Sequence, residues 1–430
     1  MIRVLFVTHC VSMAGANRSM LQLIKELRDD YGVFPFVLLP ESSGCDNTLK
    51  HYLEQENIRY KESKIVNFKL SQQDADARYV YLEGYDKLKK ICDDLRQYHF
   101  DIVHSNSSII DFGAYISSEL GAVHVWHLRD FGDLDYSLYS IFGKEYERLV
   151  YKKSDALIAI SDAIKKHFSR IADTDKIYTI YNGIALKKDV PLAKHDNSIT
   201  KFLCAGLISE GKNQKEILYA LNELVNERHI KNVHVTIIGG GNSSMYAQEM
   251  RQYCAERQLG SYVSIEKEIE GISELASTMD VGIVPSKSEA FGRVTVEYML
   301  QNLAVIANDN GANTEIIEHG KSGLIYPHGN HSALADCMQR LIQDKSLLKE
   351  LAERGRLRAK SHFLSSQNTK AIYALYKRLL SESHAGKKGL SAFLTDMRLQ
   401  LILLYERISS FAELYGREAC LRLARLCKRG

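Results

Sequence analysis

The segment that decides the fold runs from Ser286 to Pro327 and reads SKSEAFGRVTVEYMLQNLAVIANDNGANTEIIEHGKSGLIYP. Before it, the apolar residues at 281–284 predict a buried strand, and the apolar spacing after Gly292 predicts a helix. Glu289 should therefore lie in a loop at the carboxyl end of a strand, where open α/β sheets bind ligands. Glu297 follows about two helical turns later. Each carboxylate can accept two hydroxyls, which suits the vicinal diols of a sugar or a ribose.

Short apolar runs alternate with helical periodicity along the whole chain, which predicts parallel sheets covered by helices. The strand and helix pairs expected in the first half are 4–7 with 18–27, 102–104 with 112–120, and 157–160 with 163–168. A second series of strands is expected at 202–205, 233–238, 281–284 and 304–306. Two Rossmann-like domains account for both series.

Composition limits the possible functions. A chain of 430 residues is too long for one hydrophobic core, and its 45% hydrophobic and 25% charged residues are ordinary for a globular protein. A net charge of +3 is too small to indicate a nucleic-acid partner. The eight cysteines are scattered without a C-x-x-C pair or zinc spacing, so we expect a reducing, cytoplasmic setting. We expect no signal peptide in the first residues, and no apolar run reaches the length of a membrane span.

The segment from Ser286 resembles the E-x7-E signature of the retaining glycosyltransferases of family four, and the resemblance extends over nearly the whole chain. It implies an α/β protein of the GT-B fold, with two Rossmann-like domains facing a cleft and a C-terminal helical extension. The expected parts are an acceptor domain at 1–183, a nucleotide-sugar donor domain at 184–365, a crossover helix at 366–383 that returns to the first domain, and a basic amphipathic helical tail at 384–430.

The resemblance assigns roles to the residues of this signature. Glu289 would hold hydroxyls of the donor sugar, and Glu297 would bind the ribose of the nucleotide. Phe291 and Gly292 would offer backbone amides near the sugar and the phosphate. Arg293 is the remaining donor-binding candidate, because it stands directly beside the sugar loop.

Lys212 is the expected cation for the leaving diphosphate, whose developing charge needs positive charge nearby. It lies in Gly206-Leu207-Ile208-Ser209-Glu210-Gly211-Lys212-Asn213-Gln214, which resembles the family's G-R-L-x-x-x-K-G/N-Q pattern. Leu207 occupies the position of the family's arginine. We expect Arg293 or Arg18 to compensate for it in part.

Two candidates come from the first half of the chain. Gly15, in the segment Ala14 to Ser19, resembles the family's glycine loop at a helix start, although Ala14 stands where a first glycine is usual. His127, in the run V-W-H-L-R-D, resembles the histidine that touches the donor sugar in the family. We expect His124 and His104 to be structural.

The sequence indicates no cofactor and no metal site. Asp133-Leu134-Asp135 has D-x-D spacing, but the residues around it do not fit a metal-binding glycosyltransferase pattern. The triplet Gly239-Gly240-Gly241 fails the dinucleotide fingerprint because Ser244 takes the place of the third glycine. GT-B enzymes typically need no metal, because cationic side chains and helix amino ends carry the phosphate charge.

The function implied is retaining transfer of a sugar from a nucleotide-diphosphate sugar to a glycan or lipid-linked acceptor, in synthesis of cell-surface polysaccharide or glycolipid. A UDP-sugar is the favoured donor and GDP-mannose the next. The catalytic residues would be Glu289, His127 and Lys212. The alternatives are a GT-B nucleotide-sugar epimerase, which needs no acceptor, and a catalytically weak binding or scaffold subunit, which Leu207 and the long tail favour.

The tail contains an apolar series at helical spacing, which predicts an amphipathic helix. Its members are Phe393, Met397, Leu401, Leu404, Ile408, Phe411 and Tyr415. Because basic residues outnumber acidic ones there, we expect residues 390–428 to dock on anionic lipid. The protein would then be peripheral at the inner face of the plasma membrane. The alternative is that this stripe packs against the first domain or mediates self-association.

Overall fold

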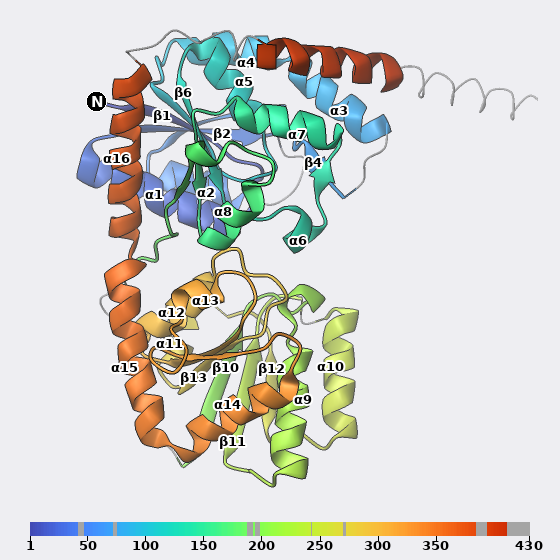
Figure 1. Cartoon of the computed structure of the whole chain (residues 1–430), viewed down its shortest axis with the longest axis vertical. Coiled ribbons are helices and arrows are strands. Elements are labelled where there is room, and N and C mark those ends of the chain that lie inside the picture. The colour runs from blue at the N-terminus through green and yellow to red at the C-terminus, as the bar shows by residue number, and fades with distance from the viewer. Residues whose placement is uncertain are drawn as a thin grey trace, which may run out of the picture. The chain divides into compact units, whose positions relative to one another are not determined.

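A computed structural model describes residues 1–41, 47–71, 75–186, 192–193, 198–241, 243–269, 272–383 and 394–410. The chain divides into two compact units, one formed by Met1–Ile180 with Thr369–Gly430 and the other by Tyr181–Asn368. Each unit has a parallel sheet covered by helices (Figure 1). The predicted α/β class with two Rossmann-like units is confirmed.

The first unit is built on a seven-stranded parallel sheet with the order β3-β2-β1-β5-β6-β8-β9. The strands are β1 (Arg3–Val7), β2 (Phe34–Pro40), β3 (Arg59–Ser63), β5 (Ile102–Ser105), β6 (Val123–Leu128), β8 (Ala156–Ala159) and β9 (Ile177–Thr179). From β1 the chain first builds outward to β3 and then returns to add β5 on the other side. The carboxyl ends of β1 and β5 therefore form the topological switch point, where ligands bind in open α/β sheets.

The sheet is buried on both faces, which explains the continuous apolar runs of its strands. Val4 to Val7 of β1 are all fully buried, as expected of a central strand between two helical layers. The helices of this unit are α1 (Gly15–Tyr31), α2 (Thr48–Gln55), α3 (Ala75–Asp86), α4 (Leu88–Arg96), α5 (Phe112–Leu120), α6 (Asp133–Tyr136), α7 (Gly143–Lys152) and α8 (Asp162–Phe168). A small antiparallel pair, β4 (Lys69–Leu70) with β7 (Tyr139–Ser140), completes it.

Local sequence signals set the helix ends. α1 stops at Gly32, whose φ of +65° and amide bond to the Arg28 carbonyl form a left-handed cap. α8 starts after Ser161, whose hydroxyl accepts from the Ile164 amide.

The helix α16 (Ser365–Ser383) belongs to the first unit from Thr369 onward. Its apolar face enters the core of that unit through Ile372, Leu375, Tyr376 and Leu379. The Thr369 hydroxyl also donates to the Glu26 carboxylate over 2.6 Å. The C-terminal part of the chain is thus an integral piece of the first unit.

The second unit contains a six-stranded parallel sheet with the order β12-β11-β10-β13-β14-β15. Its strands are β10 (Thr200–Ala205), β11 (Val233–Ile238), β12 (Val263–Glu266), β13 (Val281–Val284), β14 (Ala304–Asn308) and β15 (Leu324–Tyr326). Its α-helices are α9 (Lys215–Asn222), α10 (Met245–Glu256), α11 (Ile272–Ala276), α12 (Arg293–Leu300), α13 (Asn313–Ile316), α14 (His331–Gln343) and α15 (Lys345–His362). Here the switch point lies between β10 and β13.

The tail forms a helix over 394–410, and two different faces of it can be distinguished. Leu399 and Leu403 are buried, and the helix is joined to the first unit by ion pairs such as Arg78 with Glu406 at 3.5 Å. The predicted stripe lies on the opposite face, where Met397, Leu401, Leu404 and Ile408 are exposed. Packing on the first unit therefore uses a face other than that stripe. Phe393, Phe411 and Tyr415 lie outside the described residues.

None of the described helices combines the length and the apolar character that crossing a membrane requires.

Candidate active site

The switch point of the second unit brings Lys212 and Glu289 together. Lys212 ends a short 3-10 turn (Glu210–Lys212) in the loop after β10, and Glu289 lies in the loop after β13. The Lys212 ammonium donates to the Glu289 carboxylate over 2.6 Å. The carboxylate is mostly buried, with 13% of its side chain exposed, whereas Lys212 is 39% exposed. Both residues were predicted as catalytic, and the sheet order explains why they meet.

The backbone around Glu289 is fixed by the neighbouring loop after β14. The Glu289 carbonyl accepts from the Ala312 amide over 2.9 Å. Gly311 approaches so closely that a Cβ there would lie 2.2 Å from the Glu289 oxygen. The buried Asn308 side chain donates to the Ser286 carbonyl over 2.9 Å at the start of the same loop. The position of Glu289 thus depends on a residue without a side chain at 311.

α12 is fastened to the switch point by Tyr298. The Tyr298 hydroxyl accepts from the amide of Ala205, the last residue of β10, over 2.6 Å. Its ring lies against Gly282 of β13, where a Cβ would be 2.1 Å from the ring. Gly282 is therefore needed for close approach of helix and strand. The helix that carries Glu297 is held in register with both loops.

Glu297 and Arg293 pair with each other on α12. The Arg293 guanidinium donates to the Glu297 carboxylate over 3.1 Å at i,i+4 spacing. Glu297 is 39% exposed, so its carboxylate is accessible to a ligand hydroxyl. Arg293 lies beside Glu297 in this structure, whereas Lys212 is the cation that contacts Glu289.

Gly292 starts α12 with a φ of +89°, a conformation that side chains disfavour. Phe291 before it is buried, with its ring centroid 6.0 Å from that of Phe363, so its side chain serves packing. The predicted role of Phe291 and Gly292 is to offer the backbone amides of this helix start to a ligand. The Thr295 hydroxyl, bonded to Asn313 over 3.0 Å, joins this turn to α13.

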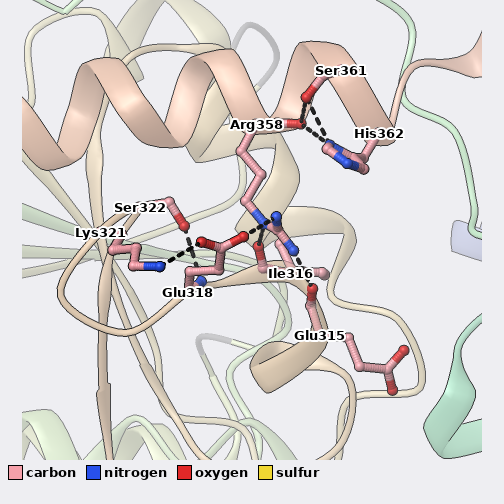
Figure 2. Close-up of polar contacts among 8 residues, drawn as sticks. All are labelled: Glu315, Ile316, Glu318, Lys321, Ser322, Arg358, Ser361 and His362. Carbon is pink, nitrogen blue, oxygen red and sulfur yellow. Dashed lines mark hydrogen bonds and ion pairs between the residues drawn. The ribbon is translucent and has the colours of Figure 1, made fainter.

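Arg358 of α15 anchors the segment after α13 (Figure 2). Its guanidinium donates to the carbonyl of Ile316 over 2.6 Å and to that of Glu315 over 2.9 Å, and it pairs with the Glu318 carboxylate at 2.5 Å. These are carbonyls at a helix end that would otherwise lack partners. Arg358 thus holds the end of α13, the short helix that directly follows Gly311 and Ala312.

The loop after β10 is closed by backbone contacts and by Gln214. The Gln214 amide nitrogen donates to the Leu207 carbonyl over 2.9 Å, and its oxygen accepts from the Ser209 amide over 3.3 Å. Gly239 packs so tightly on Gly206 that a Cβ would lie 1.8 Å from the Gly206 oxygen. This gives Gly239 a structural role. Leu207 is 58% exposed at the position where the family pattern has an arginine.

In the first unit, Gly15 starts α1 directly after the loop that follows β1. Ala14 has no side-chain cap to offer, and Asn17 organises the loop instead. Its amide donates to the carbonyls of Ser12, over 2.8 Å, and Cys10, over 3.0 Å. Its oxygen accepts from the Thr8 hydroxyl over 2.6 Å. The predicted glycine loop is therefore a rigid turn at the switch point.

His127 lies near the end of β6 and is fully buried. Its Nδ1 lies 3.1 Å from Nε2 of His104, and its Nε2 has no hydrogen-bond partner among the described residues. Burial, and then the charge of Arg129, hold the pKa of His127 well below its usual range. The ring is therefore neutral at physiological pH. Arg129 is itself buried and donates to the Asn106 oxygen over 2.5 Å.

His124 has the structural position expected of it. Its two ring nitrogens each lie 2.9 Å from a hydroxyl, of Ser105 and of Ser154. The expectation for His104 was incomplete, because its ring connects His127 to Tyr376. Arg129, Asn106 and Asn17 were not singled out from the sequence. Arg129 bonds Asn106, and Asn106 donates to the Ala16 carbonyl and to Asn17 in the loop that carries Gly15.

Asp133 and Asp135 of α6 each have a partner outside this helix. Asp135 accepts from the Phe131 amide over 2.8 Å, and Asp133 lies 3.2 Å from His167. Within the described ranges, no three His, Cys, Asp or Glu side chains are grouped closely enough to hold a metal ion.

The fold and these two switch points define a class. The chain has two Rossmann-like units, and the second carries a cation and a carboxylate at its switch point. This is the domain architecture of the GT-B proteins. Residues 13–188 match the glycosyltransferase family 4 domain, and residues 191–358 match the glycosyl transferases group 1 domain. The two matches cover both units, and the chain therefore belongs to the GT-B glycosyltransferases of family four.

Two of the similar proteins come from bacteria. The chain is 23% identical over 255 residues to N-acetyl-alpha-D-glucosaminyl L-malate synthase of Bacillus anthracis, an alignment covering 56% of this chain and 64% of the relative. It is 26% identical to the capsular polysaccharide biosynthesis glycosyltransferase CapM of Staphylococcus aureus, in an alignment that covers 53% of this chain and 62% of the relative. In both alignments the chain spans slightly less than two thirds of the relative's length.

Among solved structures, Anabaena Alr3699/HepE in complex with UDP superposes with a TM-score of 0.73 at 20% identity, covering 88% of this chain and all of that one. Similarity at this level of identity supports the fold.

Gly311 provides a test of the loop that positions Glu289. We expect Gly311→Ala to lower kcat/KM of glycosyl transfer by at least about 100-fold, because its Cβ would displace the Glu289 backbone and a misplacement of about 1 Å costs that much. The matched control is Gly320→Ala, which has the same left-handed backbone, with φ of +74°, but open space around the Cβ. Both variants carry a backbone strain of about 1–2 kcal/mol. Equal activity of the two variants would show that transfer does not depend on the position of Glu289.

Proposed function

We propose that this protein is a retaining glycosyltransferase that moves a sugar from a nucleotide-diphosphate sugar to a hydroxyl of a glycan or lipid-linked acceptor. A UDP-sugar is the favoured donor, with GDP-mannose next, and the pathway is cell-surface polysaccharide or glycolipid synthesis. The observation that carries this proposal is the bond between Lys212 and Glu289 at the switch point of the second unit. The UDP bound to the Anabaena structure and the capsular role named for CapM support the donor and the pathway.

The chemistry follows from the charges of this pair. Glu289 would orient the hydroxyls of the donor sugar, since a carboxylate accepts two hydrogen bonds at once. Lys212 would stabilise the departing diphosphate, and its partial exposure leaves it free to change partner when a donor binds. The backbone amides at Gly292 and at the start of α1 would add partial positive charge. His127 would hydrogen-bond the sugar.

In the proposed reaction, the bonds that form and the bonds that break are balanced without a further reactant. The acceptor oxygen forms a bond to the anomeric carbon on the face from which the diphosphate leaves, so the configuration is retained. The bond between that carbon and the phosphate oxygen breaks. The departing phosphate takes the acceptor proton, so the proposal needs no separate nucleophile or base.

The two glutamates should respond differently to substitution. We expect Glu289→Ala to lower kcat by about 100-fold or more, because it removes a contact that strengthens in the transition state. Glu297→Ala should raise KM for the donor with kcat little changed, because a ribose contact is equal in ground and transition states. Steady-state kinetics with UDP-sugars measure both effects. The matched control is Glu210→Ala, an exposed glutamate of the Lys212 loop that pairs with Lys287. Turnover near normal in Glu289→Ala would refute the donor-site assignment.

Transfer should also proceed without a divalent metal. We expect activity to survive EDTA, since Lys212 and backbone amides carry the diphosphate charge in this proposal. Lys212→Met should then lower kcat by about 100-fold to 1,000-fold, as for removal of a preorganised donor. Lys287→Met, which removes a lysine from the Glu289 loop, is the control and should have little effect. A strict requirement for Mn²⁺ or Mg²⁺ would overturn metal independence and return Asp133 and Asp135 to consideration.

The tail helix supports a proposal about location, namely a peripheral position on an anionic membrane. Its exposed face is continuous and apolar, and its members are Leu394, Met397, Leu401, Leu404, Tyr405 and Ile408. At 100° per residue, Arg398 and Arg407 lie on opposite sides of this stripe, and both are at least half exposed. An apolar face bordered by cations fits an anionic lipid surface, where it would hold the enzyme near a lipid-linked acceptor.

Liposome sedimentation tests this surface. We expect Leu401→Glu with Leu404→Glu to weaken binding to vesicles with anionic lipid by at least about tenfold, because each buried leucine contributes about 1.5–3 kcal/mol. Leu357→Glu is the matched control, since Leu357 is similarly exposed on α15 of the second unit. Sedimentation unchanged by the double substitution would refute membrane docking. A concentration-dependent mass that the double substitution abolishes would assign the face to self-association instead.

A further inference from the structure

Three fully buried aromatic side chains form a hydrogen-bonded chain in the first unit. Nδ1 of His104 lies 2.6 Å from the hydroxyl of Tyr376, and Nε2 of His104 lies 3.1 Å from Nδ1 of His127. The three residues come from α16, β5 and β6. All have zero exposure. The chain ends at Nε2 of His127, a buried atom that lacks a partner among the described residues.

Each ring in this chain is held in place by packing. The His104 ring centroid lies 5.1 Å from that of Phe6 on β1 and 5.2 Å from that of His127. Tyr376 is fixed because its helix neighbours Ile372 and Leu379 belong to the core of the unit. A flip of the His104 ring would break both of its hydrogen bonds. The order of the chain is therefore set by the fold.

The charge state of the two histidines follows from their surroundings. Burial first, and the charge of Arg129 second, hold the pKa of both imidazoles well below the usual value. Both rings are then neutral, so each carries one N–H and one acceptor nitrogen. With one proton per ring, the direction of one hydrogen bond fixes the direction of the next.

Tyr376 sets that direction. Among the described residues, His104 is the one hydrogen-bond partner of its hydroxyl. If the hydroxyl accepted from His104, two buried groups would lack a partner, namely the proton of Tyr376 and the acceptor Nε2 of His127, whereas the opposite direction leaves one, the Nε2–H of His127. Tyr376 therefore donates to Nδ1 of His104. Nε2–H of His104 then donates to Nδ1 of His127, and the proton of His127 resides on Nε2.

His124 shows that an unpartnered ring nitrogen is not a general property of this sheet. It lies on the same strand as His127, is also fully buried, and has a hydroxyl within 2.9 Å of each ring nitrogen. His127, in contrast, has an N–H donor left over at the end of the strand. A buried donor without a partner indicates a place for a ligand oxygen or a water.

We propose that Tyr376 and His104 are positioning residues that fix the Nε2–H tautomer of His127, so that His127 donates a hydrogen bond to a substrate oxygen and does not act as a base. This inference rests on the proposed function, because it takes His127 to contact the donor sugar. It gives α16 a role in the site in addition to its role in packing. The substrate atom recognised would be a hydroxyl or ring oxygen with a lone pair, and an N–H donor of a ligand would be rejected.

The first experiment measures the tautomer directly. The full chain is labelled with ¹⁵N-histidine, and the His127 signals are assigned by comparison with His127→Ala. We expect a protonated Nε2 and an unprotonated Nδ1 in the ligand-free protein. In Tyr376→Phe, which keeps the ring and removes the hydroxyl, we expect a mixture of tautomers. A protonated Nδ1 in the unsubstituted protein would overturn the proposal.

The second experiment measures transfer. Tyr376→Phe should lower kcat roughly tenfold, comparable with removal of a partner that orients a functional histidine. The matched control is Tyr115→Phe, which removes a buried hydroxyl bonded to Tyr146 over 2.9 Å in the same unit. Both should lose similar thermal stability. Equal kcat in these two variants would show that Tyr376 is merely structural.

A rescue variant completes the test. The side-chain amide of glutamine can donate from the position of Nε2 of His104, without help from Tyr376. We therefore expect His104→Gln in the Tyr376→Phe background to restore the His127 tautomer and to raise kcat, whereas His104→Leu should do neither. Failure of glutamine to restore the tautomer would overturn the proposed direction. The nitrogen signals need no substrate, so absence of transfer with any donor would count against the proposed function and not against the proposed tautomer of His127.

Discussion

The adjacency of β10 and β13 is the constraint on which the candidate site depends. The two strands are parallel and hydrogen-bonded, with Phe202 opposite Val281. The loops that follow them must therefore leave the sheet side by side at the same edge. This brings an ammonium and a carboxylate that are 77 residues apart into a hydrogen bond. The oxygens of that carboxylate can accept hydrogen bonds from hydroxyls.

Close backbone approach maintains this geometry. Gly311 against Glu289, Gly282 against Tyr298 and Gly239 against Gly206 are three contacts in which a Cβ would lie 2.2 Å or less from a neighbouring atom. Side chains with several hydrogen bonds, such as Gln214 and Arg358, complete the support. These contacts restrict the loops after β10 and β13, which carry Lys212 and Glu289.

The switch point of the first unit is held in place by different kinds of side chain. Asn17 closes the loop before α1, and a helix from the far end of the sequence supplies Tyr376 to a buried pair of histidines. In the second unit, Leu207 is a point where this protein departs from its family pattern. The structure leaves its side chain exposed, and the cation that lies on Glu289 is Lys212.

The sequence alone predicted the alternation of strands and helices, because apolar periodicity is a local property of a chain, and its motifs, through their resemblance to a family, indicated the class and singled out Lys212 and Glu289 as candidates. It also indicated the amphipathic tail. It could not show that Lys212 contacts Glu289, that Arg293 pairs with Glu297, or that His104 connects Tyr376 to His127, which are 249 residues apart in numbering. It could not show which face of the tail packs. Strand order and helix docking decided these points, because they place distant residues side by side. The burial of a side chain and the direction of its hydrogen bonds are defined only once its neighbours in space are fixed.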